Sequence, residues 1–317
     1  MSNEFDIIKK YFTHPTSHTD LGVGDDAALI QVAKGCQLAI STDISVVGTH
    51  FFKDTAPHDI GWKSLAVNVS DMAAMGANPK WATLSITLPE VDDAWLVEFS
   101  RGFLACADFF KIDLIGGDTT RGPLNIAVQI MGEIPVGEAL TRSGAKAGDD
   151  IWVSGNLGSA ALGLAHLQQH QALNDETTRN ACLKALHTPQ PSIALGLALR
   201  ALAHSCIDIS DGLLADLGHI LKASNVGATI QLEKIPCLPA FTAYIKEPTI
   251  QQAVLAGGDD YELCFTASPS MHSTISAFSK TRNINLAKIG KVNASGALVV
   301  TLEKENLTMT QLGYDHF

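Results

Sequence analysis

The sequence predicts a two-domain protein of the α/β class, and three observations lead to that prediction. Its 317 residues exceed the length at which one hydrophobic core keeps growing. Short apolar segments of strand length alternate with longer segments whose apolar residues recur at helical spacing. The polar stretch 137–150, rich in small residues, marks a boundary. We therefore expect an N-terminal domain of sheet and helices over residues 1–137 and a C-terminal α/β domain over residues 138–317.

The elements of the first domain follow from its periodicity. Apolar residues recur at helical spacing between 59 and 75, so Asp71 is expected on a helix rather than in a loop. The continuous apolar run 112–115 is typical of a buried strand, and a Gly-Gly-Asp turn is expected after it. The full prediction comprises helices over 3–12, 59–75 and 93–110, and strands over 38–40 (running into 41–43), 81–88, 112–115 and 124–132.

The second domain is predicted to begin with a strand over 151–154, a glycine-rich turn and a helix over about 159–169. The turn, with Gly155 and Gly158, has two possible interpretations: a tight connection, or a phosphate cradle at the helix N-terminus. It matches neither the P-loop nor the dinucleotide-binding pattern. The remaining prediction comprises helices over 175–186, 191–203 and 212–224, and strands over 206–209, 226–232, 261–266, 286–292 and 297–302.

Composition argues against several classes of function. Apolar residues make up 46% of the chain and charged residues 17%, which is typical of a core-rich globular protein. The formal net charge of −11 argues against nucleic-acid binding, although by itself it only favours solubility. No apolar run approaches the roughly 18 residues of a membrane span. Six scattered cysteines without a C-x-x-C pair indicate buried free thiols, so we expect a soluble, cytoplasmic protein.

Carboxylates beside Gly, Ser or Thr recur at six places. Small neighbours allow a ligand to approach the backbone closely, although each such Asp taken singly is more often a turn or N-cap residue. If the groups converge, two like charges about 4 Å apart repel by about 4 kcal/mol at a dielectric of about 20, so cations are needed. Oxygen ligands of this kind favour Mg²⁺ and, with it, a nucleotide. The six segments are 24–26, 41–43, 70–71, 116–118, 208–211 and 257–260.

Several familiar catalytic patterns are absent from the sequence. It contains no H-R-D or D-F-G kinase signature, no H-E-x-x-H zinc motif and no G-x-S-x-G nucleophile elbow. Arg142 is by default a surface charge, but its guanidinium matches phosphate oxygens in a bidentate manner, so it is also a candidate phosphate clamp. Any phosphoryl transfer would therefore use machinery different from that of protein kinases.

Taken together, the motifs resemble those of the thiamine-monophosphate kinase family. They occur in the family's order over nearly the whole chain, and LIGGDTTRGP is a specific string. The family belongs to the superfamily of aminoimidazole ribonucleotide synthetase and selenophosphate synthetase. The resemblance implies an N-terminal domain that forms a homodimer through its sheet and an α/β C-terminal domain that completes the active site. The motifs are GVGDD (22–26), STD (41–43), AVNVSDMAAMG (66–76), LIGGDTTRGP (114–123), LTRSG (140–144), IDISDG (207–212), GGDDYEL (257–263) and GYDHF (313–317).

The implied reaction transfers phosphate from ATP to thiamine monophosphate and yields thiamine diphosphate. The acceptor is a phosphate monoester, already ionised near neutral pH, so no catalytic general base is expected. The difficulty is to bring two anions together, for which several Mg²⁺ ions and direct in-line transfer are expected. The implied Mg²⁺ ligands are Asp26, Ser41, Thr42, Asp43, Asp71, Asp118, Asp208 and Asp211; the implied ATP contacts are Gly117, Asp118, Arg142 and Ser210; the implied thiamine phosphate contacts are His50, Asp259 and Tyr314.

The sequence departs from the family pattern in three segments. Asp259 stands where the family usually has Glu, which is one methylene longer, and the segment 44–50 is a loose match. The turn 158–160 lacks the family's carboxylate. The alternatives are another ATP-using member of the superfamily, a Mg²⁺-dependent phosphatase, and a non-enzymatic acidic scaffold. Selenophosphate synthetase is disfavoured because residues 1–30 contain no Cys.

Overall fold

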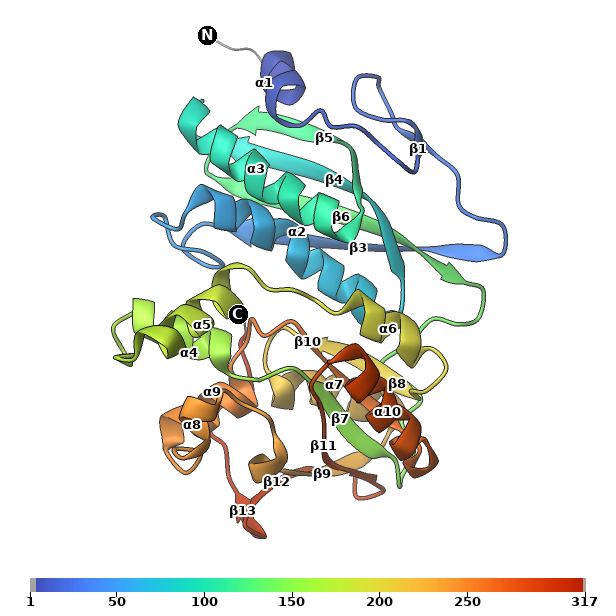
Figure 1. Ribbon diagram of the computed structural model, residues 1–317, viewed down its shortest axis with the longest axis vertical. Coiled ribbons are helices and arrows are strands. Elements are labelled where there is room, and N and C mark those ends of the chain that lie inside the picture. The colour runs from blue at the N-terminus through green and yellow to red at the C-terminus, as the bar shows by residue number, and fades with distance from the viewer. Residues whose placement is uncertain (1–3, 316–317) are drawn as a thin grey trace. The chain divides into compact units, whose positions relative to one another are not determined.

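A computed structural model of the protein describes residues 4–315 (Figure 1). They divide into two compact units: the first comprises the chain up to Met72 and Ala77–Ala139, and the second comprises Ala73–Gly76 and the chain from Leu140. The predicted domain division at 137/138 stays a prediction. Residues 73–76 belong with the second unit, which the periodicity of the sequence does not indicate.

The first unit is built on a four-stranded sheet in the order β3-β6-β4-β5. The pairs β3·β6 and β6·β4 are antiparallel and β4·β5 is parallel. Helix α3 connects the two parallel strands, and it lies with α2 on one face of the sheet (Figure 1). The elements are β3 (Cys36–Val46), α2 (Pro57–Ala74), β4 (Asn78–Leu88), α3 (Asp93–Phe110), β5 (Asp113–Arg121) and β6 (Asn125–Pro135).

Local sequence explains these helices well. The Asp92 side chain accepts hydrogen bonds from the N–H groups of Ala94 and Trp95 and so starts α3. The helix ends at Lys111, which adopts the left-handed conformation. Helices α2 and α3 cross closely because glycines face the contact: a Cβ on Gly61 would lie 2.1 Å from the Phe99 carbonyl oxygen. The crossing therefore depends on the absence of a side chain.

The N-terminal segment contains α1 (Glu4–Tyr11), β1 (Thr19–Leu21) and β2 (Leu29–Ile30). Helix α1 packs beside α3 and β5, and the residues after it cover part of the opposite sheet face. Ala28 and Ile30 pack against a small core of Trp81, Ile115 and Met131. Residue 3 of the helix predicted over 3–12 lies outside the described residues, as do residues 316 and 317 of the C-terminal motif. The segment therefore leads from α1 across the sheet and carries Asp25 and Asp26 on its way.

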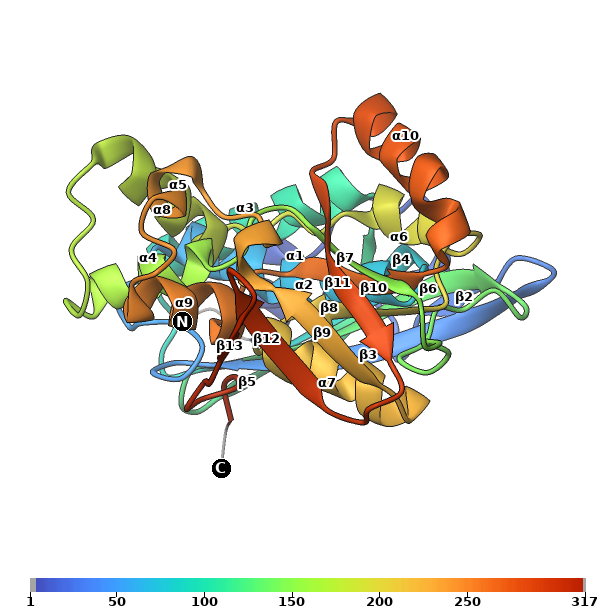
Figure 2. The ribbon, with the colours of Figure 1, turned by 90° about the horizontal axis from the view of Figure 1, so that it is seen from below.

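The second unit has a seven-stranded, mostly antiparallel sheet in the order β13-β12-β9-β11-β7-β10-β8, counted over the described residues. One core packs α4, α5, α7 and α9 on one face, and the other packs α6 and α10 on the opposite face, as Figure 2 shows for α7 and α10. The strands are β7 (Asp150–Ser154), β8 (Ser205–Ile209), β9 (Gly227–Gln231), β10 (Glu262–Ala267), β11 (Leu286–Asn293), β12 (Leu298–Leu302) and β13 (Glu305–Leu307). The helices are α4 (Ser159–Leu167), α5 (Glu176–His187), α6 (Ile193–Leu199), α7 (Leu213–Ser224), α8 (Pro239–Thr242), α9 (Pro248–Ala256) and α10 (His272–Arg282), with short 3₁₀ turns at Leu232–Lys234 and Pro269–Met271.

The structure corrects three expectations. Residues 116–118 are not a turn but the middle of β5, because parallel pairing with β4 continues through them to Arg121. The helix predicted over 191–203 is confined to Ile193–Leu199. All six cysteines are free as expected, but Cys36 and Cys237 are only partly buried because one lies on an edge strand and the other in a connection. No helix among residues 4–315 is long and apolar enough to cross a membrane.

Candidate active site

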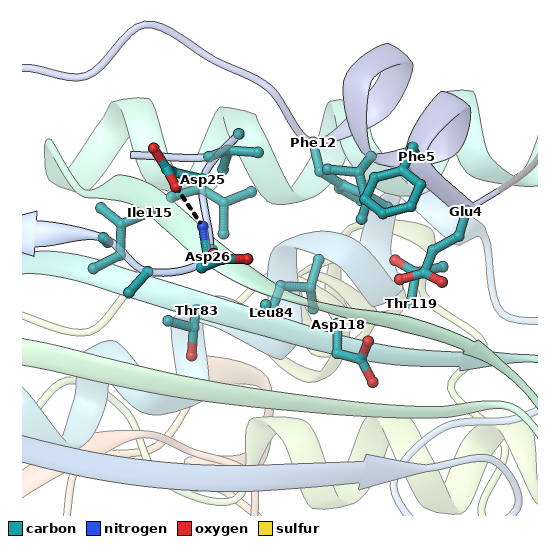
Figure 3. Close-up of a pocket in the computed structure, with 18 residues that line it drawn as sticks. Glu4, Phe5, Phe12, Asp25, Asp26, Thr83, Leu84, Ile115, Asp118 and Thr119 are labelled. Atoms are coloured by element: carbon teal, nitrogen blue, oxygen red, sulfur yellow. Dashed lines mark hydrogen bonds between the residues drawn. The ribbon is translucent and has the colours of Figure 1, made fainter. Parts of the chain in front are cut away.

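The first unit contains a pocket of about 550 Å³ between α1, the loop that follows β1, and strands β4 and β5 (Figure 3). Phe5 of α1 and Phe12, directly after that helix, line it together with Asp25, Asp26 and Asp118. Its volume lies in the range of small-molecule sites, which are mostly apolar with a few placed polar groups. The pocket thus brings together three residues implied by the sequence, Asp26, Gly117 and Asp118.

Two neighbouring glycines of β5, Gly116 and Gly117, line this pocket. Gly117 has φ +148°, and a Cβ on it would lie 1.7 Å from the Leu84 carbonyl oxygen. Only glycine fits that position. A Cβ on Gly116, in contrast, would meet nothing within 4 Å. The two positions therefore differ: one requires glycine for the strand pairing, and the other leaves open space beside the strand.

A second group of implied ligands gathers where β3 meets α2. The Ser41 hydroxyl donates a hydrogen bond of 2.5 Å to Asp71 Oδ2. Asp71 lies on α2, as the periodicity predicts, and both residues are half-buried. Thr42 is exposed and accepts a hydrogen bond of 3.3 Å from Gln129. Ser41 and Asp71 are thus an oxygen-rich pair that could bind a divalent cation.

The sheet does not bring the β3 residues together with Asp118. Asp43 pairs with Val128 of β6, which pairs with Leu84 of β4, and Leu84 pairs with Gly117 of β5. Three strand spacings of about 4.8 Å place the two edges about 14 Å apart. No group of three His, Cys, Asp or Glu among the residues that the structure describes is arranged to hold one metal ion.

His50 lies in the turn after β3. The backbone N–H of Val46 donates a hydrogen bond of 3.0 Å to its Nδ1, which leaves the imidazole half-buried beside the strand end. Arg142, in the second unit, is exposed, and its carbonyl oxygen accepts a hydrogen bond from Ser224 at 3.4 Å. The first contact orients the His50 ring, and the second holds the backbone of Arg142.

In the second unit, one short turn connects most of the implied residues. Asp208 is buried in β8, and the turn 210–212 leads from that strand into α7. The Ser210 carbonyl oxygen accepts a hydrogen bond of 2.9 Å from the Asp259 N–H. The Asp211 carbonyl oxygen accepts one of 3.0 Å from the Tyr314 N–H. The implied contacts for metal, nucleotide and thiamine phosphate in this unit therefore share one backbone framework.

Asp216 is a member of this site that the sequence patterns did not single out. Its carboxylate accepts hydrogen bonds from the N–H groups of Ser210, Asp211 and Gly212. Burial raises the pKa of Asp216 to about 7, and the nearby charges of Asp208 and Asp211 add to the effect. The available signal was an acidic residue within the apolar pattern of α7, four positions after the turn.

Two further buried acids border the glycine-rich turn 155–158. Asp260 accepts a hydrogen bond of 2.8 Å from the Gly158 N–H, at the N-terminus of α4. Burial raises the pKa of Asp260 well above its usual range. Glu262 accepts a hydrogen bond from the Ser154 hydroxyl, and burial raises its pKa to about 7. Because the protein's own carboxylate occupies this helix end, the tight-turn interpretation is favoured over a phosphate cradle.

Comparison with known proteins decides the family. The chain matches the family described as AIR synthase related protein, N-terminal domain, over residues 24–134, and the C-terminal domain of that family over residues 146–303. It is 44% identical over 318 residues to the thiamine-monophosphate kinase of Escherichia coli K12, with 99% of this chain and 98% of that protein covered.

The chain belongs to the thiamine-monophosphate kinase family. Its structure is similar to a crystal structure of thiamine-monophosphate kinase from Stenotrophomonas maltophilia K279a, with a TM-score of 0.84, 43% identity and 92% of each chain covered. It is also similar to a structure described as AaThiL complexed with AMPPCP and TMP, with a TM-score of 0.77, 29% identity, and 99% of this chain and 96% of that chain covered. The mixed α/β, two-domain arrangement is therefore that of the thiamine-monophosphate kinase family.

Proposed function

We propose that this protein is a kinase that transfers the γ-phosphoryl group of ATP to thiamine monophosphate and forms thiamine diphosphate. The observation that carries the proposal is the 44% identity to a thiamine-monophosphate kinase over 99% of the chain. A relative with 29% identity has been solved with AMPPCP, an ATP analogue, and TMP. The pocket beside Asp26, Gly117 and Asp118 has a size suited to a small ligand such as a nucleotide.

The donor set in both units fits Mg²⁺, because it consists of carboxylate and hydroxyl oxygens. The hydrogen-bonded pair Ser41 and Asp71, and the charges of Asp208 and Asp211 near Asp216, support cation binding at these places. Bound Mg²⁺ would neutralise the phosphates and align them for transfer. The residues that would hold it are Asp26, Ser41, Thr42, Asp43, Asp71, Asp118, Asp208 and Asp211.

The chain's own residues then have to bind and orient two anions. Gly117, Asp118, Arg142 and Ser210 contact the nucleotide in this proposal, and the Arg142 guanidinium provides bidentate donors for phosphate. Thiamine monophosphate needs no general base, since its phosphate is already an ionised nucleophile. The transfer is therefore direct and in line, without a phosphoenzyme.

His50, Asp259 and Tyr314 are the proposed contacts for thiamine phosphate. Asp259 is held with φ +69°, and the Tyr261 hydroxyl donates a hydrogen bond of 2.9 Å to its Oδ1. This contact fixes the carboxylate that replaces the longer Glu of the family. Half the surface of Tyr314 is exposed, which leaves its ring accessible for stacking on a cationic heterocycle.

We also propose a homodimer that forms through the first unit's sheet. Ile40 and Ile44 of edge strand β3 are more than half exposed, at 56% and 53%, which is unusual for large apolar residues on a sheet. Asp43 and Asp118 lie on opposite edge strands of the sheet. This separation supports metal sites whose ligands come from different segments or from a second copy of the chain. A cytoplasmic location stays a prediction of the sequence.

The test is product analysis with ATP, Mg²⁺ and thiamine monophosphate, with a control that omits the acceptor. Equal amounts of thiamine diphosphate and ADP, formed only with acceptor, are expected. Phosphate release without acceptor would favour a phosphatase. Absence of both reactions would contradict the proposal and direct attention to other substrates of the superfamily or to a binding protein.

A further inference from the structure

Three backbone N–H groups converge on a single oxygen of Asp216. Ser210, Asp211 and Gly212 donate to Asp216 Oδ2 at 3.0, 3.1 and 3.1 Å. Only 2% of the surface of Asp216 is exposed, so these bonds are shielded from water. Hydrogen bonds are stronger in such a low-dielectric environment than in water. Asp216 therefore fixes the backbone of three consecutive residues.

The bonding differs from that of an ordinary helix cap. A usual N-cap side chain precedes the helix and accepts from N–H groups of its first turn. Asp216 lies inside α7 and reaches back to the N–H groups before it, so the structure that it orders is the turn 210–212. Asp216 also places a third carboxyl group near those of Asp208 and Asp211, which a simple cap would not require.

The ordered turn has little freedom to move on its remaining sides. Gly212 has φ +122°, and a Cβ on it would lie 2.7 Å from the Ala256 carbonyl carbon at the end of α9. The turn's carbonyl oxygens hold the backbones of Asp259 and Tyr314 at 2.9 and 3.0 Å. A shift of the turn would therefore move both of these residues as well as its own side chains.

We infer that Asp216 is a positioning residue for both substrates. Through the turn 210–212 it places Ser210 and Asp211, the proposed contacts for nucleotide and metal. The carbonyl oxygens of these two residues in turn place Asp259 and Tyr314, the proposed contacts for thiamine phosphate. This inference rests on the proposed kinase function. It assigns no contact with substrate to Asp216 itself. Its loss weakens the recognition of ATP and of thiamine monophosphate together, although they are bound by different side chains.

The test compares Asp216→Asn and Asp216→Ala with Asp149→Asn in the full chain. Asp149 is a matched control because it is only 3% exposed and its carboxylate also accepts a hydrogen bond from a backbone N–H of a turn, that of Lys146, at 2.9 Å. Asp149 contacts His204 next to the start of β8, whereas the turn 210–212 follows the other end of that strand. The readouts are kcat, KM for ATP, KM for thiamine monophosphate, and the midpoint of thermal unfolding.

Asp216→Ala removes the acceptor oxygen and is expected to raise both KM values about tenfold, in the range typical for loss of a group that orients a binding residue. Asp216→Asn keeps an oxygen that can accept the N–H bonds, so a smaller rise of both KM values is expected. Asp149→Asn is expected to lower the thermal midpoint without a change in KM. The inference is overturned if folded Asp216→Ala keeps both KM values within about twofold of wild type. If Asp216→Ala does not fold, Asp216→Asn decides, and unchanged KM values for it overturn the inference.

A second measurement separates this inference from the proposed function. Calorimetric titration of AMPPCP with Mg²⁺ measures nucleotide affinity without any turnover. A wild-type protein that forms no thiamine diphosphate would refute the kinase proposal, and a weaker AMPPCP affinity of Asp216→Asn would still support positioning. An active wild type with equal AMPPCP affinities for wild type and Asp216→Asn would refute the positioning role alone.

Discussion

Replacement of Glu262 by glutamine is expected to change how the protein's stability depends on pH. The Glu262 carboxyl group is enclosed between Ser154 and Gly155, where a Cβ on Gly155 would lie 1.8 Å from one of its oxygens. Burial raises its pKa from 4.5 to about 7. Between these values the folded protein keeps a proton that the unfolded chain releases, so folding stability falls as pH rises through this window. Glutamine does not ionise and lacks this dependence.

The size of the effect follows from the pKa difference. A change from 4.5 to about 7, at about 1.4 kcal/mol for each unit, corresponds to about 3 kcal/mol. The free energy of unfolding of Glu262→Gln, relative to wild type, is therefore expected to increase by about 3 kcal/mol between pH 4.5 and pH 8. The Gln side-chain oxygen can still accept the hydrogen bond from Ser154, which limits other losses.

The assay is equilibrium urea unfolding at several pH values, followed by circular dichroism and tryptophan fluorescence. The exposed Glu305 gives a matched control, since Glu305→Gln is expected to follow the wild-type curve at every pH. A difference between Glu262→Gln and wild type that stays constant within about 0.5 kcal/mol from pH 4.5 to pH 8 would refute the reasoning. It would mean that burial does not raise the pKa of Glu262 in the folded protein.

Three further predictions concern the first unit and the metal. Asp71→Asn is expected to lower kcat at least about a hundredfold with the fold intact, because its carboxylate is proposed to be shared between ions; near-normal turnover with an unchanged circular dichroism spectrum would contradict the assignment. Gly117→Ala is expected to destabilise the protein by about 3 kcal/mol in thermal unfolding, because the added Cβ would meet the Leu84 oxygen. Gly116→Ala, beside open space, is the control and is expected to be nearly neutral. Equal melting midpoints for the two variants would refute this. Removal of divalent cations with EDTA is expected to abolish turnover and added Mg²⁺ to restore it, and turnover that persists in EDTA would count against metal-assisted transfer.

Most of the helices and strands could be predicted from local sequence because their signals are local. The alternation of buried residues in β4 and the cap at Asp92 each depend only on residues that are close in the sequence. The position of Asp71 on a helix followed from spacing alone and is confirmed. The short helix α9 was missed, since its apolar residues alone do not distinguish a helix from a strand.

The candidate site could be predicted only in part. Sequence motifs indicated Ser210, Asp211 and Asp259 by resemblance, but not that hydrogen bonds join them through one turn. Asp216 carried no motif of its own, and its importance depends on three N–H groups that meet it only in the folded chain. Long-range pairing of this kind has no fixed sequence spacing, so a linear pattern does not reveal it.

The sequence by itself determined the family, the element types and the residue chemistry, because these depend on composition, short-range spacing and ordered motifs. Tertiary structure alone decided that residues 116–118 continue a strand, since pairing with β4 overrides their turn propensity. It decided that Asp260 fills the N-terminus of α4, and that the edge strands of the first sheet are separated by two others. Each of these outcomes depends on which backbone groups come into contact in space, and that is set by packing between residues distant in the chain.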